Sequence, residues 1–182
     1  GESYREYLRL KTNGLNESIY SLNNLGVLPR YEALLGLLPY LTTRNPKQAF
    51  VVGYGGGFTV DLLSTLDLHS VHVVELERGI VDAANDVHQG KNPILARKNV
   101  KLEIDDARYA LSVAREPKYE IIVSQPSHSW LSGAANLFTK EFFEMACERD
   151  YRPPTKSQRL RFVLHRLWER SGSQQPFEEW YA

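Results

Sequence analysis

The chain has 182 residues with 22 basic and 22 acidic side chains, so its formal net charge is zero, and 42% of its residues are hydrophobic. This composition is typical of a soluble globular protein and argues against a nucleic-acid or anionic-membrane surface as the main partner. The single cysteine, Cys147, excludes an intramolecular disulfide, and the five histidines show no zinc-ligand spacing. No apolar run approaches the roughly 20 residues that span a bilayer, and the polar start lacks the pattern of a signal peptide, so we expect none. We therefore expect a cytoplasmic protein that binds a small molecule and no metal.

A β-hairpin and a helix are the first elements predicted along the chain. Apolar residues recur near every second position across 7–21, on either side of Asn13-Gly14, and Asn-Gly readily supplies the two positive-φ residues of a type I′ turn. A leucine-rich helix then begins near Pro29, because the first helical turn has no use for the N–H that proline lacks. We assign residues 1–28 to an N-terminal hairpin region.

Strands and helices alternate over the following part of the chain. Short apolar strands are expected at 49–52, 71–76, 100–104 and 119–123, with helices near 60–66, 80–87 and 107–114. This alternation predicts a parallel sheet covered on both faces, with ligands at the carboxyl ends of its strands. The sequence thus predicts an α/β domain over residues 29–150.

The segment 151–182 is basic, with six basic and three acidic residues, which fits a solvated face or a binding patch. Alternating apolar residues favour a strand to about His165, although a helix also fits the pattern. We assign this segment to the end of the same domain. A sheet of this kind needs more strands than so short a tail provides, so we expect that residues are missing near 150–151.

The glycine-rich turn Gly53-Tyr54-Gly55-Gly56-Gly57 lies between the first central strand and a helix. Glycine lets a backbone approach a bound molecule without an intervening Cβ, and a helix N-terminus offers free N–H donors. The turn therefore predicts a nucleotide-type ligand, although glycines also permit a tight turn without any ligand. Its spacing differs from the dinucleotide fingerprint GxGxxG, which makes NAD the weaker candidate.

Acidic residues end the next two expected strands. A carboxylate at Glu75 can accept both hydroxyls of a ribose, unless it is an exposed strand-end acid. One of Asp105 and Asp106 can accept a hydrogen bond from the exocyclic amine of adenine. This pair could also bind a metal ion, but no third ligand lies nearby in the sequence. With the glycine turn, these acids predict an adenosyl ligand.

A polar loop, 124–133, follows the fourth expected strand. Only His128 in this loop titrates near neutral pH, and it is either a catalytic base or an ordinary surface histidine.

Together these residues resemble the spermidine/spermine synthase family of aminopropyltransferases, and in particular its bacterial members that are fused to membrane segments. The resemblance covers about residues 7–145 and is carried by the hairpin, 51–57, 73–77, Asn92-Pro93, 105–108, 125–130, Gly133 and 137–143. It implies a Rossmann-like class I S-adenosylmethionine-dependent methyltransferase fold with an N-terminal β-hairpin.

The resemblance also implies a reaction, in which an aminopropyl group moves from decarboxylated S-adenosylmethionine to a polyamine acceptor without a metal. It implies nucleoside contacts at the glycine turn, Glu75, Asp105, Asp106, Ala107 and Ser124. Tyr31 and Gln125 are the candidate substrate contacts, and Gln125 and His128 are the candidate catalytic residues. Family members commonly pair through the hairpin region, so a homodimer is expected by analogy.

Two positions depart from the family pattern. Gly56 stands where the family has an aspartate that attracts the aminopropyl ammonium, and Gln125 stands where it has the acidic base. Glutamine cannot accept the proton that an amine of pKa about 10 must lose before it attacks. Two alternatives therefore stay open: a methyltransferase that uses ordinary S-adenosylmethionine, whose carboxylate suits glycine N–H groups, and a non-catalytic nucleoside-binding member of the family.

Overall fold

The N-terminal hairpin is present in the structure, a computed structural model that describes residues 7–12, 14–21, 30–114, 119–124, 137 and 139–148. Strands β1 (Tyr7–Thr12) and β2 (Leu15–Ser21) pair antiparallel. Gly14 has a φ of 79°, as the predicted turn requires, while Asn13 lies outside the described residues. The alternation of apolar residues thus predicted this hairpin correctly.

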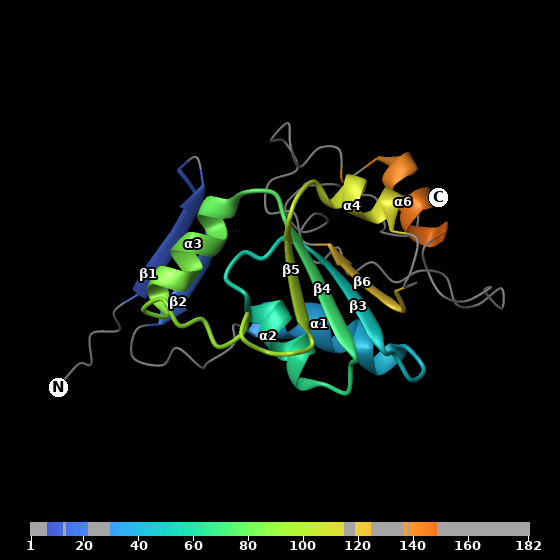
Figure 1. Ribbon diagram of the computed structural model, residues 1–182, viewed down its shortest axis with the longest axis horizontal. Helices are drawn as coiled ribbons and strands as arrows, with labels where there is room; N and C mark the ends of the chain where they lie inside the picture. The colour runs from blue at the N-terminus through green and yellow to red at the C-terminus, as the bar shows by residue number, and fades with distance from the viewer. Residues whose placement is uncertain are drawn as a thin grey trace, which may run out of the picture.

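The other helices and strands alternate along the chain, and all of them except α6 were predicted from the hydrophobic pattern. They are α1 (Arg30–Thr42), β3 (Gln48–Val52), α2 (Phe58–Thr65), β4 (Ser70–Glu75), α3 (Arg78–Val87), β5 (Val100–Ile104), α4 (Ala107–Val113), β6 (Ile121–Ser124) and α6 (Lys140–Glu148). Strands β3 to β6 form one parallel sheet in the order β5-β4-β3-β6, separate from the hairpin (Figure 1). The predicted Rossmann-like fold is confirmed, and all four strands end at one edge of the sheet.

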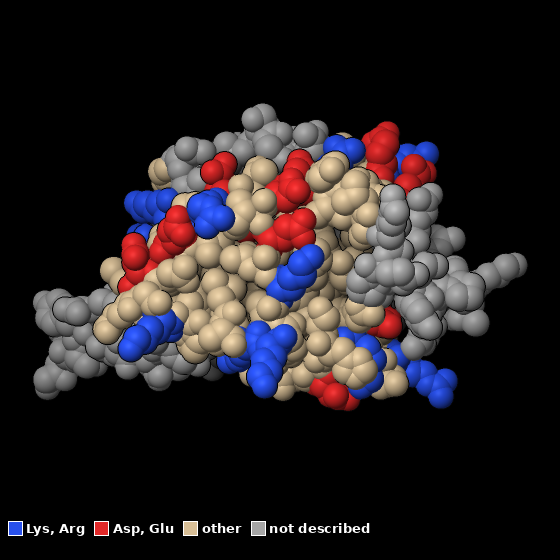
Figure 2. Space-filling model, viewed as in Figure 1, with Lys and Arg blue, Asp and Glu red and all other residues tan. Residues whose placement is uncertain are grey.

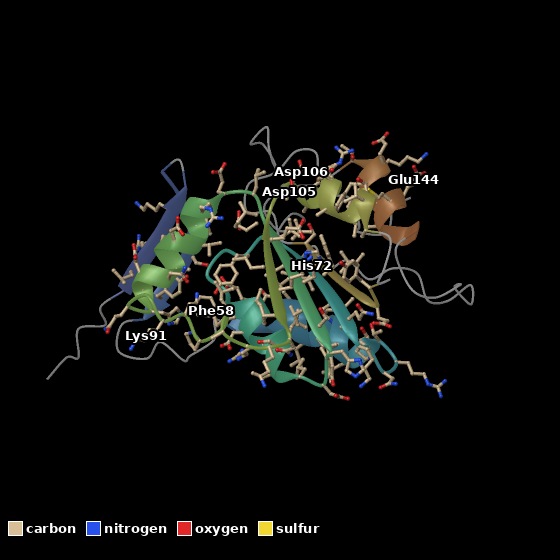
Figure 3. All side chains as sticks on the ribbon, in the orientation of Figure 1. Phe58, His72, Lys91, Asp105, Asp106 and Glu144 are labelled. Atoms are coloured by element: carbon tan, nitrogen blue, oxygen red, sulfur yellow. The ribbon has the colours of Figure 1, made fainter. Side chains whose placement is uncertain are left out.

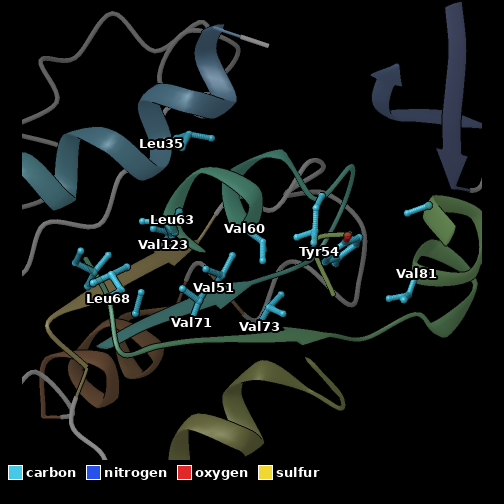
Figure 4. Packing of buried hydrophobic residues seen from close by; sticks show 14 residues of the cluster. Leu35, Val51, Tyr54, Val60, Leu63, Leu68, Val71, Val73, Val81 and Val123 are labelled. Carbon is cyan, nitrogen blue, oxygen red and sulfur yellow. The ribbon is translucent and has the colours of Figure 1, made fainter. Parts of the chain in front are cut away.

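Helices cover both faces of the sheet and bury two apolar clusters. On one face, Leu35 of α1 and Leu63 of α2 pack with Val51 and Val73 (Figure 4). On the other face, α4 and α6 pack against a cluster that includes Phe50. Each fully buried aliphatic or aromatic side chain contributes about 1.5–3 kcal/mol, so these clusters hold the strand ends in place. No helix in the described part of the chain is long and apolar enough to cross a membrane.

A polar network on the α4 and α6 face of the sheet begins at the buried His72 and Tyr119 and ends at the exposed Lys101. His72 Nδ1 lies 2.7 Å from the Tyr119 hydroxyl, and His72 Nε2 lies 2.9 Å from Glu103 Oε2, which also binds Lys101 Nζ at 3.2 Å. Burial and the Lys101 charge lower the pKa of His72, against the opposing influence of Glu103. A neutral imidazole fits this geometry, because Nε2–H donates to the carboxylate while Nδ1 accepts from the phenol.

Candidate nucleoside-binding site

The glycine turn connects β3 to α2 at the carboxyl edge of the sheet. Gly53, Gly55 and Gly57 have φ values of 85°, 51° and 78°, in the left-handed region that favours glycine. Gly57 is the N-cap of α2 and makes no side-chain capping bond. The first N–H groups of this helix therefore remain suited to a ligand acceptor.

Glu75 ends β4 beside this turn, and its side chain is buried, with 5% exposed. Its Oε2 accepts a hydrogen bond from Tyr54 N at 2.7 Å, and its Oε1 accepts one from Glu77 N at 2.9 Å. Each carboxylate oxygen has capacity for a further bond. Two backbone donors thus fix the carboxylate at the predicted ribose position, and it is not an exposed strand-end acid.

Asp105 and Asp106 follow β5 and lie close together at the same edge (Figure 3). Asp106 is the N-cap of α4, and its Oδ1 accepts from Arg108 N at 2.7 Å and from Tyr109 N at 3.2 Å. Asp105 Oδ1 accepts from Asp106 N at 2.7 Å. An aspartate directly before an apolar helix is a capping signal, so the sequence is also consistent with this structural role of Asp106. Acidic side chains cover the carboxyl ends of β4 and β5 in the space-filling view (Figure 2).

The order of the strands arranges the predicted site residues in a row. Asp105 follows β5, Glu75 ends β4, the glycine turn follows β3, and Ser124 ends β6. Neighbouring strands lie about 4.8 Å apart, so the row is about 14 Å long. Ser124 is buried, and its hydroxyl has no hydrogen-bond partner among the described residues. The predicted adenine contacts thus lie at the end of β5 and the predicted ribose contact at the end of β4, with the glycine turn and Ser124 next to them in the row.

The hairpin forms a wall beside the glycine turn. A Cβ on Gly56 would lie 2.5 Å from Ser18 Oγ and 2.7 Å from the Phe58 ring. The ring centroids of Tyr20 and Phe58 are 5.2 Å apart. The Tyr20 hydroxyl is buried without a hydrogen-bond partner in the described part of the chain. Ser18 and Tyr20 were not predicted site residues, because no local sequence signal shows where a hairpin docks.

Of the remaining predicted site residues, the structure describes some only in part and others not at all. Tyr31 lies in the first turn of α1, but its side chain, like Gln125 and His128, lies outside the described residues. Ala107 is buried at the start of α4. Among the described residues, no group of three or more His, Cys, Asp or Glu could hold a metal ion.

This parallel sheet, with a glycine turn and an anchored acid at its carboxyl edge, defines a class I methyltransferase-type fold. The chain belongs to the spermine/spermidine synthase domain family, whose model matches residues 28–149. It is 27% identical over 115 residues to spermidine synthase 1 of Pisum sativum, covering 63% of this chain and 34% of the relative.

Two further similarities are found, one in sequence and one in fold. Over 115 residues the chain is 26% identical to putrescine N-methyltransferase 3 of Nicotiana tabacum, covering 63% of this chain and 30% of the relative. A crystal structure of spermidine synthase with the transition-state analogue AdoDATO superposes with a TM-score of 0.66 at 16% identity, over 76% of this chain and 45% of that one. The matched part of the chain therefore spans about a third of the length of these curated relatives.

Proposed function

We propose that this edge of the sheet binds decarboxylated S-adenosylmethionine and that the protein transfers its aminopropyl group to a polyamine. The observation that carries the proposal is the buried Glu75 carboxylate, which two backbone N–H groups hold beside the glycine turn. In this arrangement Glu75 accepts the ribose hydroxyls, while Asp105 and Asp106 face the adenine. Ser124 and the turn lie near the sulfur substituent.

The reaction is a displacement at carbon. The neutral amine of the acceptor forms a bond to the aminopropyl carbon, the bond from that carbon to sulfur breaks, and methylthioadenosine leaves with the electron pair. The amine must lose a proton, and positioning it in line with the breaking bond supplies much of the rate. We assign acceptor positioning to Tyr31 and Gln125, and proton removal to His128.

Glu32 offers a carboxylate on the hairpin side of the turn, where Gly56 offers none. It lies in the first turn of α1 with 6% exposed, and its carbonyl oxygen accepts from Thr59 Oγ1 at 3.3 Å. Burial raises the pKa of Tyr20, and Tyr54 and the nearby Glu32 charge add to this shift. Because a buried ammonium needs a compensating charge, we assign Glu32 to the aminopropyl ammonium.

Methyl transfer from ordinary S-adenosylmethionine is the second candidate function. It is favoured by the crowded space at Gly56, which leaves backbone N–H groups and no carboxylate from the turn itself. Such donors suit the carboxylate of the carboxylated nucleoside. The similarity to a putrescine N-methyltransferase agrees with this candidate.

The finer predictions from family resemblance remain proposals. They are a homodimer that pairs through the hairpin region, a cytoplasmic location, and a closest relationship to the bacterial members fused to membrane segments. The break expected near 150–151 also stays a prediction, and an intact mass equal to 20.8 kDa would contradict it.

Calorimetry with methylthioadenosine, decarboxylated S-adenosylmethionine and S-adenosylmethionine tests the function. A product assay with putrescine and spermidine then follows for the ligand that binds most tightly. Preference for the decarboxylated form, with turnover, is the expected result. Preference for the carboxylated form would favour methyl transfer, and tight binding without product would favour a non-catalytic nucleoside-binding protein.

A matched pair of variants tests the role of Glu75. Glu120 also accepts hydrogen bonds from two backbone donors, Lys47 N at 3.1 Å and Gln48 N at 2.7 Å, but at the opposite edge of the sheet. We expect Glu75→Gln to raise the Kd for methylthioadenosine about tenfold or more, because it removes charge-assisted bonds. Glu120→Gln should leave this Kd unchanged. Equal effects of the two variants would refute the assignment.

A further inference from the structure

The connection between α3 and β5, residues 88–99, braces the glycine turn through a buried side-chain pair. Asn92 Nδ2 donates to the Tyr54 hydroxyl at 2.9 Å, and Asn92 Oδ1 accepts from Ile94 N at 3.1 Å. Asn92 is 8% exposed and Tyr54 is 4% exposed. The nitrogen and the oxygen of the Asn92 side-chain amide are therefore both hydrogen-bonded inside the fold, where losing a partner is costly.

Tyr54 belongs to the turn, but its side chain points into the apolar cluster shown in Figure 4. Its hydroxyl lies 2.6 Å from the position of a Cβ on Gly57, so the phenol fills the volume that glycine leaves open. Burial raises the pKa of Tyr54 to about 12, so the hydroxyl remains neutral. The backbone N of the same residue donates to Glu75 Oε2 at 2.7 Å. Tyr54 thus joins the Asn92 amide to the Glu75 carboxylate.

The same connection also binds α2 itself, at two places. Arg97 Nη1 donates to Asp61 O at 2.9 Å and forms an ion pair with the Asp61 carboxylate. Asn99 Nδ2 donates to Ser64 O at 3.0 Å, near the end of the helix that lies away from the turn. Asn99 therefore donates from the same side-chain amide group as Asn92 does, but to the backbone of α2 and not to Tyr54 in the turn.

We propose that Asn92 and Tyr54 are positioning residues for the nucleoside, which act through the glycine turn and Glu75. This inference rests on the proposed function. Without the Asn92 donor, the buried phenol loses its partner, and relaxation of the ring displaces the backbone that fixes the Glu75 carboxylate. A ligand held by several fixed donors loses affinity when those donors are no longer preorganised.

Three single variants and one double variant test the inference. The Kd for methylthioadenosine is measured by calorimetry, and the free energy of unfolding is measured by urea denaturation, under conditions where each variant is folded. We expect Asn92→Ala and Tyr54→Phe each to raise the Kd about fivefold to tenfold. Asn99→Ala should lower stability but keep the Kd within about twofold of wild type. The double variant Asn92→Ala/Tyr54→Phe should raise the Kd no more than the single variant with the larger rise does, because Asn92 and Tyr54 act as one unit.

The outcomes separate this inference from the function on which it rests. No binding by the wild-type chain would overturn the proposed function and the inference together. Wild-type binding that Asn92→Ala and Tyr54→Phe leave unchanged would overturn the inference alone. An equal rise in Kd for Asn99→Ala would also overturn it, because the effect would then reflect general loosening of α2.

Discussion

Replacing Gly56 with aspartate would place a carboxylate at the fourth residue of the glycine turn, where the resemblance to the family implies one. In this fold the new Cβ would lie 2.5 Å from Ser18 Oγ and 2.7 Å from the Phe58 ring, whereas real Cβ atoms essentially never come within 3.0 Å of such atoms. Overpacking a core typically costs about 1–3 kcal/mol. The added carboxylate would also be desolvated, so we expect a loss of about 2–5 kcal/mol of unfolding free energy in total.

Gly79→Asp is the matched control, since it makes the same chemical change in the first turn of α3. A Cβ there meets no atom within 4 Å, and an acid near a helix N-terminus is slightly stabilising. We expect a change within about 0.5 kcal/mol for this variant. Ser18→Ala in the Gly56→Asp background removes the nearest atom and should recover part of the loss.

Urea denaturation followed by circular dichroism measures these differences, with equal m-values required for a direct comparison. The reasoning is refuted if Gly56→Asp unfolds at the same urea concentration as Gly79→Asp. Aminopropyl transfer above the wild-type rate by Gly56→Asp would likewise show that the hairpin wall leaves room for an acid.

Three further predictions concern packing, pH and the ammonium site. Gly57→Ala adds a Cβ 2.6 Å from the Tyr54 hydroxyl, whereas Gly90→Ala, at a similar φ, meets no atom within 4 Å. We expect Gly57→Ala to lower the free energy of unfolding, measured in urea, by about 1–3 kcal/mol more than Gly90→Ala does. Equal losses would contradict the close packing of Tyr54 against Gly57. Burial keeps the pKa of His72 below its usual value, so this imidazole binds a proton more readily in the unfolded chain than in the folded one. Stability should therefore fall as the pH drops below about 6.5, by at most about 1.4 kcal/mol per pH unit. His72→Gln should remove this contribution. If the unfolding free energy of His72→Gln and of wild type changed equally with pH, His72 would not be its source. Glu32→Gln should weaken the binding of decarboxylated S-adenosylmethionine about tenfold and leave the binding of methylthioadenosine, which has no ammonium, unchanged. An equal loss of affinity for both ligands would exclude the assignment of Glu32 to the ammonium.

The sequence by itself determined the hairpin, the parallel α/β sheet and the acidic residues that lie at the carboxyl edge of this sheet. Alternating apolar residues and helical spacing are local patterns, so they predicted strands such as β4 and helices such as α3. Glu75 and Asp105 were predicted to lie at strand ends, at the same edge of the sheet as the glycine turn, because parallel strands all end at one edge of a sheet. The structure places them there.

Only the tertiary structure decided which side chains support the turn and which space remains beside it. Asn92 binds Tyr54 across 38 positions of sequence, and Ser18 reaches Gly56 from a separate sheet. Such contacts depend on how the hairpin and the connection after α3 dock, and no local periodicity encodes that docking. The sequence therefore predicted Tyr54 only as part of a ligand-binding turn. In the fold its side chain packs into the core, and its backbone N–H donates to Glu75.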